Sequence, residues 1–323
     1  ALAVAAAADA AEVWMVFLAA FAVGSLGVLF DAGLQAWLPA LLPESSLVSV
    51  NARLQFVRTA AWTLGPPIAG YLVARSEGFG LALGVDAATF VVSVLFVLML
   101  REIRPRPSVE RGSWWDSFRV GIRYLWGERS LRTATIAATI VNFTFVPMEA
   151  LLVLFARDRL DISEEYLIGW FFAGHALLGA LGVGAAPRLA RWLGLGRTFV
   201  LGLAMLGGGF LVLSALAVPF AALSPVGSTM AAIVPAGVAV AGVSFTNVAF
   251  TTLRQQLPPP DLLGRVISAS RTISWAGIPV GAALGGRLAE AFGITGVYLG
   301  ASTALVGTAL AVGLTRLWRS PAV

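Results

Sequence analysis

Residues 271–279 read RTISWAGIP, and residues 58–66 read RTAAWTLGP. The two stretches share Arg, Thr, Trp and Pro at the same spacing, 213 residues apart. A phenylalanine and an LP pair recur just upstream at an offset of 215, as Phe30 with Leu42-Pro43 and as Phe245 with Leu257-Pro258. Because recurrence at a fixed offset marks an internal repeat, we expect the chain to contain two pseudo-repeated halves.

The repeat lies in a strongly apolar chain. Of its 323 residues, 58% are hydrophobic and 12% are charged, and the mean hydropathy is +0.86. Soluble domains carry about 25% charged residues. The apolar residues fall in blocks of about 20, the length at which a helix crosses about 30 Å of hydrocarbon. Since lipid offers no hydrogen-bond partners to an open backbone, the sequence predicts an all-α membrane protein.

About nine complete transmembrane helices are expected, with the apolar run at residues 1–8 as the stub of a tenth. The predicted spans are Val13–Leu34, Leu54–Ala74, Leu81–Leu100, Thr133–Phe155, Leu167–Pro187, Thr198–Phe220, Met230–Thr252, Val266–Ala289 and Ile294–Thr315.

The gaps between spans predict the orientation, because loops rich in arginine stay in the cytoplasm. Sixteen arginines fall on one side of the predicted bundle, eight of them within residues 101–132. The other side has three arginines and is rich in acids, including Asp9 and Glu12. We therefore expect a multi-pass protein of the inner (plasma) membrane with a cytoplasmic C-terminus.

The longest polar segment, residues 101–132, divides the chain. Within it, Trp115, Phe118, Ile122 and Trp126 recur at helical spacing, which is typical of an amphipathic helix lying in the membrane interface. The predicted domains are a partial N-terminal bundle at 1–100, this cytoplasmic linker, a C-terminal six-helix bundle at 133–315 and a cytoplasmic tail at 316–323.

Several motifs resemble one transporter family. Leu64 to Gly70 reads LGPPIAG and is similar to an antiporter motif, GPxxGG, while the other matching stretches run from Leu263 to Glu290 and from Phe30 to Pro43. They resemble the major facilitator superfamily, in the branch of enterobactin exporters and macrolide-efflux pumps. The resemblance implies two bundles of six helices. Three helices would then precede residue 1, so we interpret the chain as an N-terminally truncated fragment.

Polar side chains within the predicted spans are the candidates for binding substrate or coupling ions, because ionisable groups in a bilayer are costly. Glu149 and Asn142 lie two turns apart in one span, and His175 is the only histidine, a residue type whose unperturbed pKa of about 6.5 suits proton handling. Asp31 and Asn247 are the other candidates, although an interhelical hydrogen bond or a pair with a cytoplasmic arginine is the favoured explanation of Asp31. His175 in a packing role is also an open alternative.

A second group is expected to gate or pack the helices. Arg58 and Arg271 are related by the repeat, and Asp86 lies one turn inside a span. Small residues let helices approach closely and proline permits kinks. The candidates of this kind are Gly65, Pro66, Gly70, Pro279, Gly285 and Gly286. Plain tight packing explains the same residues.

The predicted function is secondary active efflux of small amphipathic compounds such as drugs or siderophores, by proton-coupled antiport and alternating access. The alternatives are a non-functional fragment of such a transporter or an importer of the same superfamily. An intramembrane enzyme is disfavoured because no nucleophile–base arrangement accompanies His175. The chain lacks cysteine and lysine, which excludes thiolate metal sites and a P-loop. We expect no cofactor, no metal and no nucleic-acid partner, and a monomer whose partners are substrate, coupling ion and lipid.

Overall fold

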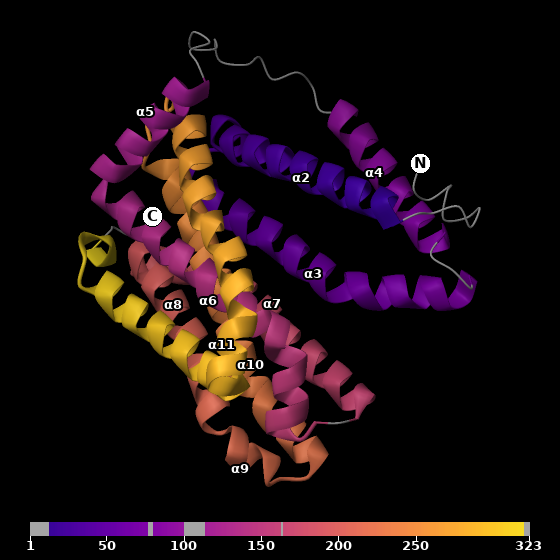
Figure 1. The fold of residues 1–323 in the computed structure, drawn as a ribbon. Helices are drawn as coiled ribbons and strands as arrows, with labels where there is room; N and C mark the ends of the chain where they lie inside the picture. Colours follow the sequence, from indigo (N-terminus) through magenta and orange to yellow (C-terminus); the bar gives the residue numbers. More distant parts are fainter. Residues whose placement is uncertain (1–12, 77–79, 100–113, 163, 320–323) are drawn as a thin grey trace. The chain divides into compact units, whose positions relative to one another are not determined.

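The computed structural model describes residues 13–76, 80–99, 114–162 and 164–319. These residues are almost entirely helical (Figure 1). The elements are α2 (Val13–Leu41), α3 (Glu44–Ser76), α4 (Gly80–Met99), α5 (Trp114–Gly127), α6 (Arg129–Leu160), α7 (Glu165–Leu193), α8 (Leu195–Ala215), α9 (Ala217–Ala221), α10 (Pro225–Gln256), α11 (Leu263–Gly313) and the short 3-10 helix η1 (Arg316–Arg319).

Helices α6 and α10 extend beyond the predicted spans, and a side chain caps the first turn of each. The Glu128 side chain accepts a hydrogen bond from the Ser130 amide at the start of α6. Asp161 ends the same helix in the left-handed conformation, with φ 53°. At α10, the Ser224 hydroxyl accepts from the Gly227 amide and Pro225 occupies the first turn. Such caps satisfy backbone groups that a helix leaves open.

Six described helices are long and apolar enough to cross a membrane: α4, α6, α7 (from Tyr166), α8, α10 and α11. The 51-residue α11 is two helices joined at Gly293, whose φ of 69° and ψ of 165° are not helical. Its two parts, on either side of this break, run in opposite directions (Figure 1). The helical fold is therefore confirmed, whereas nine spans remain a prediction. The predicted stub at 1–8, Asp9, Glu12 and the tail beyond 319 lie outside the described residues.

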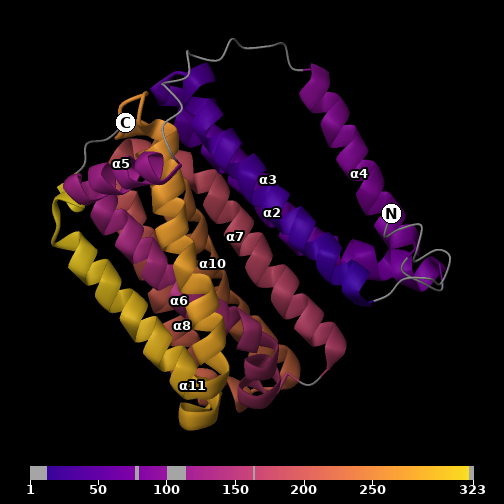
Figure 2. The same cartoon turned by 45° about the horizontal axis from the view of Figure 1, so that its top comes forward.

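The chain forms two compact units, one comprising residues 1–34 and 60–112 and the other residues 35–59 and 113–323. In the first unit, the described helix α4 has no buried residue. The second unit holds α5 to α11. Its helices α6, α8, α10 and α11 lie side by side (Figure 2).

Glycines set the spacing of α6 and α11 in the second unit. A Cβ on Gly277 would meet the Thr139 carbonyl oxygen at 2.5 Å, and one on Gly285 would meet Pro147 at 2.8 Å. Small residues at such crossings let two backbones come into contact. Farther along, the Tyr298 hydroxyl of α11 donates to the Met148 carbonyl of α6 at 2.5 Å. The two helices are thus held together along most of α6.

Residues 35–59 pack with the second unit, although the repeat assigns them to the first half of the chain. Val48 and Ala52 of α3 are each 4% exposed and belong to the same core cluster as Phe250 and Leu253 of α10. The division by contacts therefore differs from the predicted division at residue 100. The physical reason is that the apolar face of the first turns of α3 is buried against α10.

Candidate functional site

A buried cluster of polar side chains joins residues 35–59 to the last turn of α10. The Asn51 side-chain amide donates to Thr252 Oγ1 at 3.1 Å and to Gln255 Oε1 at 2.6 Å. The Gln255 amide in turn donates to the Gln35 carbonyl oxygen at 3.0 Å, and an Arg254 Nη donates to Gln35 Oε1 at 3.1 Å. We call these five residues the polar bridge.

Helix geometry brings these residues together. Gln35 lies in the last two turns of α2, Asn51 in the second turn of α3, and the other three in the last turn and a half of α10. Asn51, Thr252 and Gln255 are buried. A buried polar group without a partner costs about 1–3 kcal/mol, so each side chain depends on the others. The bridge is stable only while residues 35–59 and α10 are in contact.

Two buried arginines, Arg254 of the polar bridge and Arg271, lie over aromatic rings. The Arg254 guanidinium lies 4.3 Å from the ring centre of Phe250, and that of Arg271 lies 4.1 Å from the ring centre of Trp275. Arginine over an aromatic face gains about 2 kcal/mol or more where water is excluded. These rings help to hold positive charge at this end of the bundle.

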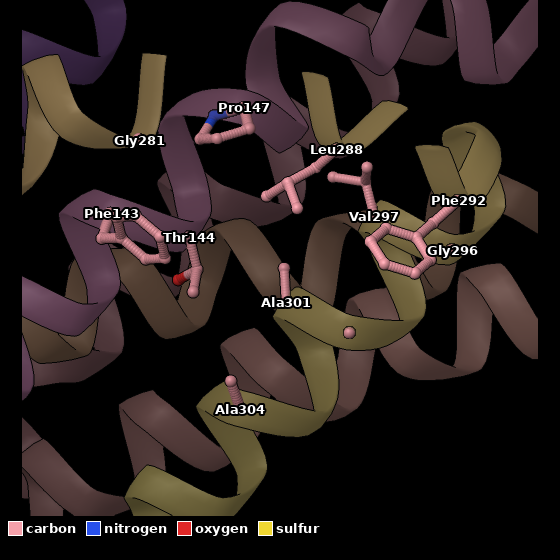
Figure 3. Close-up of a pocket in the computed structure, with 11 residues that line it drawn as sticks. Phe143, Thr144, Pro147, Gly281, Leu288, Phe292, Gly296, Val297, Ala301 and Ala304 are labelled. Carbon is pink, nitrogen blue, oxygen red and sulfur yellow. The ribbon is translucent and has the colours of Figure 1, made fainter. Parts of the chain in front are cut away.

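An apolar pocket of about 370 Å³ lies between α6 and the two parts of α11 (Figure 3). Phe143, Thr144 and Pro147 form the α6 side of the pocket. The Thr144 hydroxyl donates to backbone oxygens of its own helix, at 2.8 Å to Ile140. The α11 side consists of Gly281, Leu288, Phe292, Gly296, Val297, Gly300, Ala301 and Ala304. Pockets of this size suit small organic molecules, and this lining would bind their apolar parts.

The predicted coupling residues are spread over several helices. On α6, the Asn142 amide donates to the Ser274 carbonyl at 2.8 Å, and the exposed Glu149 follows seven residues later on the same helix face. His175 is buried on α7, its ring 4.9 Å from that of Phe171. Asn247 is exposed on α10, and Asp31 is half-buried on α2. The pocket lining given by the described residues includes none of these five.

The predicted gating residues also lie apart. Gly285 contacts Pro147, whereas the surroundings of Gly286 are open among the described residues. Arg271 is buried, and its repeat partner Arg58 is exposed on α3. Asp86, Gly65 and Pro279 are exposed. Pro66 and Gly70 lie on α3, and the structure does not describe their burial.

Sequence reasoning missed the polar bridge. Gln35, Asn51, Thr252 and Gln255 are not among the sequence candidates, and Arg254 is only one of the sixteen arginines that indicate the orientation. One signal was present in the sequence. Each bridge residue lies within about eight residues of an LP pair, Leu42-Pro43 or Leu257-Pro258. Amides at the ends of apolar spans next to such turns are candidates for contacts between helices.

Long apolar helices packed through glycines define a multi-pass helical membrane protein. The family model of the Major Facilitator Superfamily matches residues 1–282, and the chain belongs to this family. It is accordingly a transporter and not an enzyme.

The chain is similar to known efflux proteins. It is 27% identical to the multidrug efflux pump Tap of Mycolicibacterium fortuitum over 286 residues, covering 86% of this chain and 67% of that protein. It is 22% identical to macrolide efflux protein A of Streptococcus pyogenes over 305 residues, covering 92% and 72%. The chain thus spans about two thirds of the length of the Tap pump.

Among solved structures, the chain is similar to a bacterial homologue of the iron transporter ferroportin, crystallised in an outward-facing state. The TM-score is 0.68 with 20% identity, and the alignment covers 94% of this chain and 75% of that one. This likeness concerns the fold.

Proposed function

We propose that this chain acts as a secondary active exporter of small amphipathic compounds. The observation that carries the proposal is the polar bridge, in which side chains of residues 35–59 and α10 bury their hydrogen-bonding groups together. The similarity to multidrug and macrolide efflux proteins supports the class of compound.

The polar bridge would act as the closed gate at the arginine-rich end of the bundle. The arginines indicate that this end lies in the cytoplasm, together with the C-terminus. The proposal also includes nine crossings of the inner membrane. While the bridge is formed, access from that side is blocked. Separating Asn51 from Gln255 would expose the route, so that alternating formation and loss of the bridge gives alternating access.

The apolar pocket supports the chemistry proposed for the substrate. Among the described residues that line it, Thr144 alone has a hydroxyl, and this hydroxyl is already bonded to the backbone. Such a lining discriminates poorly between ligands of similar size, because one methylene changes binding by only about 1–3 kcal/mol. Broad selectivity for apolar groups is the expected result.

Proton antiport is the proposed coupling, with Glu149 as the group that binds the proton. This side chain is exposed within the membrane-spanning part of α6. A carboxyl at this depth is costly when charged and therefore tends to carry a proton or pair with a cation.

A disulfide across the polar bridge tests the proposal. The chain has no cysteine, so Asn51→Cys with Gln255→Cys forms the only possible pair. Oxidation should stop efflux of ethidium and of a macrolide from cells, and reduction should restore it. Thr135→Cys with Ser270→Cys is the matched control, because these hydroxyls lie 2.9 Å apart between α6 and α11 and neither residue belongs to the bridge. Efflux that continues through a fully cross-linked bridge would contradict the proposal.

A further inference from the structure

We propose that α5 carries a binding face for anionic phospholipid headgroups and that binding there stabilises the polar bridge. The lipid contact itself is independent of transport, whereas the effect on the bridge rests on the function proposed above.

One face of α5 combines exposed tryptophans with arginines. Trp115, Arg119 and Trp126 follow one another at intervals of four and seven residues, which places them on one side of the helix. Trp115 is 61% exposed and Trp126 is 45% exposed. Arg119 and the adjoining Arg123 are also exposed. Two large aromatic rings therefore lie on the same open face as two guanidinium groups.

The chemistry of this face fits a lipid headgroup layer. Tryptophan is enriched at membrane interfaces, where its apolar ring and polar N–H both find a suitable environment. Arginine forms paired hydrogen bonds with phosphate oxygens. The described residues 114–132 contain four arginines against two acids, Asp116 and Glu128, for a net charge of +2. Positive charge next to transmembrane helices attracts anionic lipid.

The opposite face of α5 is attached to the protein. Leu125 is fully buried. Gly121 lies so close to α11 that a Cβ there would collide with the Arg265 carbonyl oxygen and would lie 3.3 Å from the Ala269 Cβ. Because this side is fixed, α5 presents its Trp–Arg face outward as a rigid unit.

A hydrogen bond connects α5 to the turn after the polar bridge. The Tyr124 hydroxyl donates to the Leu257 carbonyl oxygen at 3.0 Å. Leu257 follows Gln255 by two residues, and Arg265 lies in the first turn of the next helix, α11. Helix α5 thus contacts the residues on both sides of the turn between α10 and α11. Lipid that holds α5 in place would also hold the end of α10 where Asn51 binds.

Lipid contact is measured first. Gly127→Cys, on an exposed position beside Trp126, is labelled with bimane in the full chain and placed in nanodiscs of equal parts phosphatidylglycerol and phosphatidylcholine. Brominated phosphatidylglycerol should quench the label more than brominated phosphatidylcholine. Arg119→Gln with Arg123→Gln should weaken this preference about five-fold per arginine. Arg188→Gln with Arg191→Gln, the same charge change at exposed positions of α7, should leave it intact. Equal quenching by both lipids, or equal effects of the two double variants, would overturn the proposal.

The coupling is measured by the rate of disulfide formation between Asn51→Cys and Gln255→Cys. Phosphatidylglycerol should increase this rate relative to phosphatidylcholine alone. Tyr124→Phe should remove the lipid dependence of the rate while quenching by brominated phosphatidylglycerol persists. A rate that is the same in both lipids would overturn the proposed effect of lipid on the polar bridge. The export proposal would be unaffected, because it is tested by the effect of cross-linking on efflux.

Discussion

The side-chain amide of Asn51 lies 2.6 Å from Gln255 Oε1, although 204 residues separate the two in the sequence. This hydrogen bond is the shortest of those that join residues 35–59 to α10 in the polar bridge. Both residues are buried. Substitutions at or near this contact therefore report directly on whether the bridge is closed.

Replacing Asn51 by Ala should open the bridge. Thr252 and Gln255 would each lose a buried partner, which costs about 1–3 kcal/mol and favours the open arrangement about 5- to 140-fold. The measurement is the labelling rate of Val48→Cys, one turn away and 4% exposed, by a water-soluble maleimide. The same cysteine in the parent is the control. Equal labelling in the two proteins would show that Asn51 does not hold the bridge.

Replacing Gly277 by Ala should destabilise the contact between α6 and α11. The added Cβ would meet the Thr139 carbonyl oxygen at 2.5 Å, and overpacking of this kind costs about 1–3 kcal/mol. Gly286→Ala is the matched control on the same helix, because the described residues leave its Cβ position open. Thermal unfolding in detergent should show a lower midpoint for the first variant only. Similar midpoints would argue against close packing at Gly277.

Filling the apolar pocket should weaken substrate binding. Ala301→Leu adds three carbon atoms to a residue that lines the pocket. The expected result is a higher KM for efflux of large apolar compounds, with smaller effects on small ones. Gly286→Leu, outside the pocket lining, controls for added bulk on α11. If KM for the large compounds stays unchanged, the pocket does not contribute to transport.

The hydrogen bond from Tyr124 to the Leu257 carbonyl oxygen should persist at alkaline pH. Burial, and then the Glu128 carboxylate, raise the pKa of the Tyr124 phenol above its usual 10. The stabilisation is therefore fully present below about pH 10, the unfolded pKa, and is lost as pH rises through the higher folded pKa. Tyr124→Phe should cost about 0.5–1.5 kcal/mol. Its difference in midpoint from the parent should stay constant to pH 10 and shrink above it. If the difference in midpoint between the parent and Tyr124→Phe vanishes below pH 9, the hydrogen bond does not stabilise the protein.

Glu149→Gln should abolish the dependence of efflux on the proton gradient, because an amide cannot exchange a proton. The measurement is efflux of ethidium with and without a protonophore. Asp86→Asn is the control, since Asp86 is likewise an exposed carboxylate within a membrane helix, α4. Gradient-dependent efflux that persists in Glu149→Gln would remove this residue from coupling.

The helices themselves could be predicted, because each needs only a local run of apolar residues. The amphipathic α5 was also visible, since Trp115, Phe118, Ile122 and Trp126 repeat at helical spacing. The break within α11 was anticipated as a gap between Ala289 and Ile294, and Gly293 lies inside it.

The sites were harder to predict because they depend on contacts between distant residues. Asn142 was selected as a polar residue within a span, but its partner, the Ser274 carbonyl, is set by where α11 crosses α6. Likewise Asn51 and Gln255 look like ordinary polar residues at helix ends. The pocket is formed by small residues such as Gly300 and Ala304, which in sequence are indistinguishable from residues of a tight helix contact.

The burial of Val48 and Ala52 against α10 also bears on the energy of a transport cycle. Exposing a side chain such as that of Val48 to water costs about 1.5–3 kcal/mol. One elementary charge that crosses a potential of about 100 mV releases about 2.3 kcal/mol. These quantities are of similar size. In the ion-coupled cycle proposed above, the electrical work of one ion would therefore match the cost of exposing one such side chain.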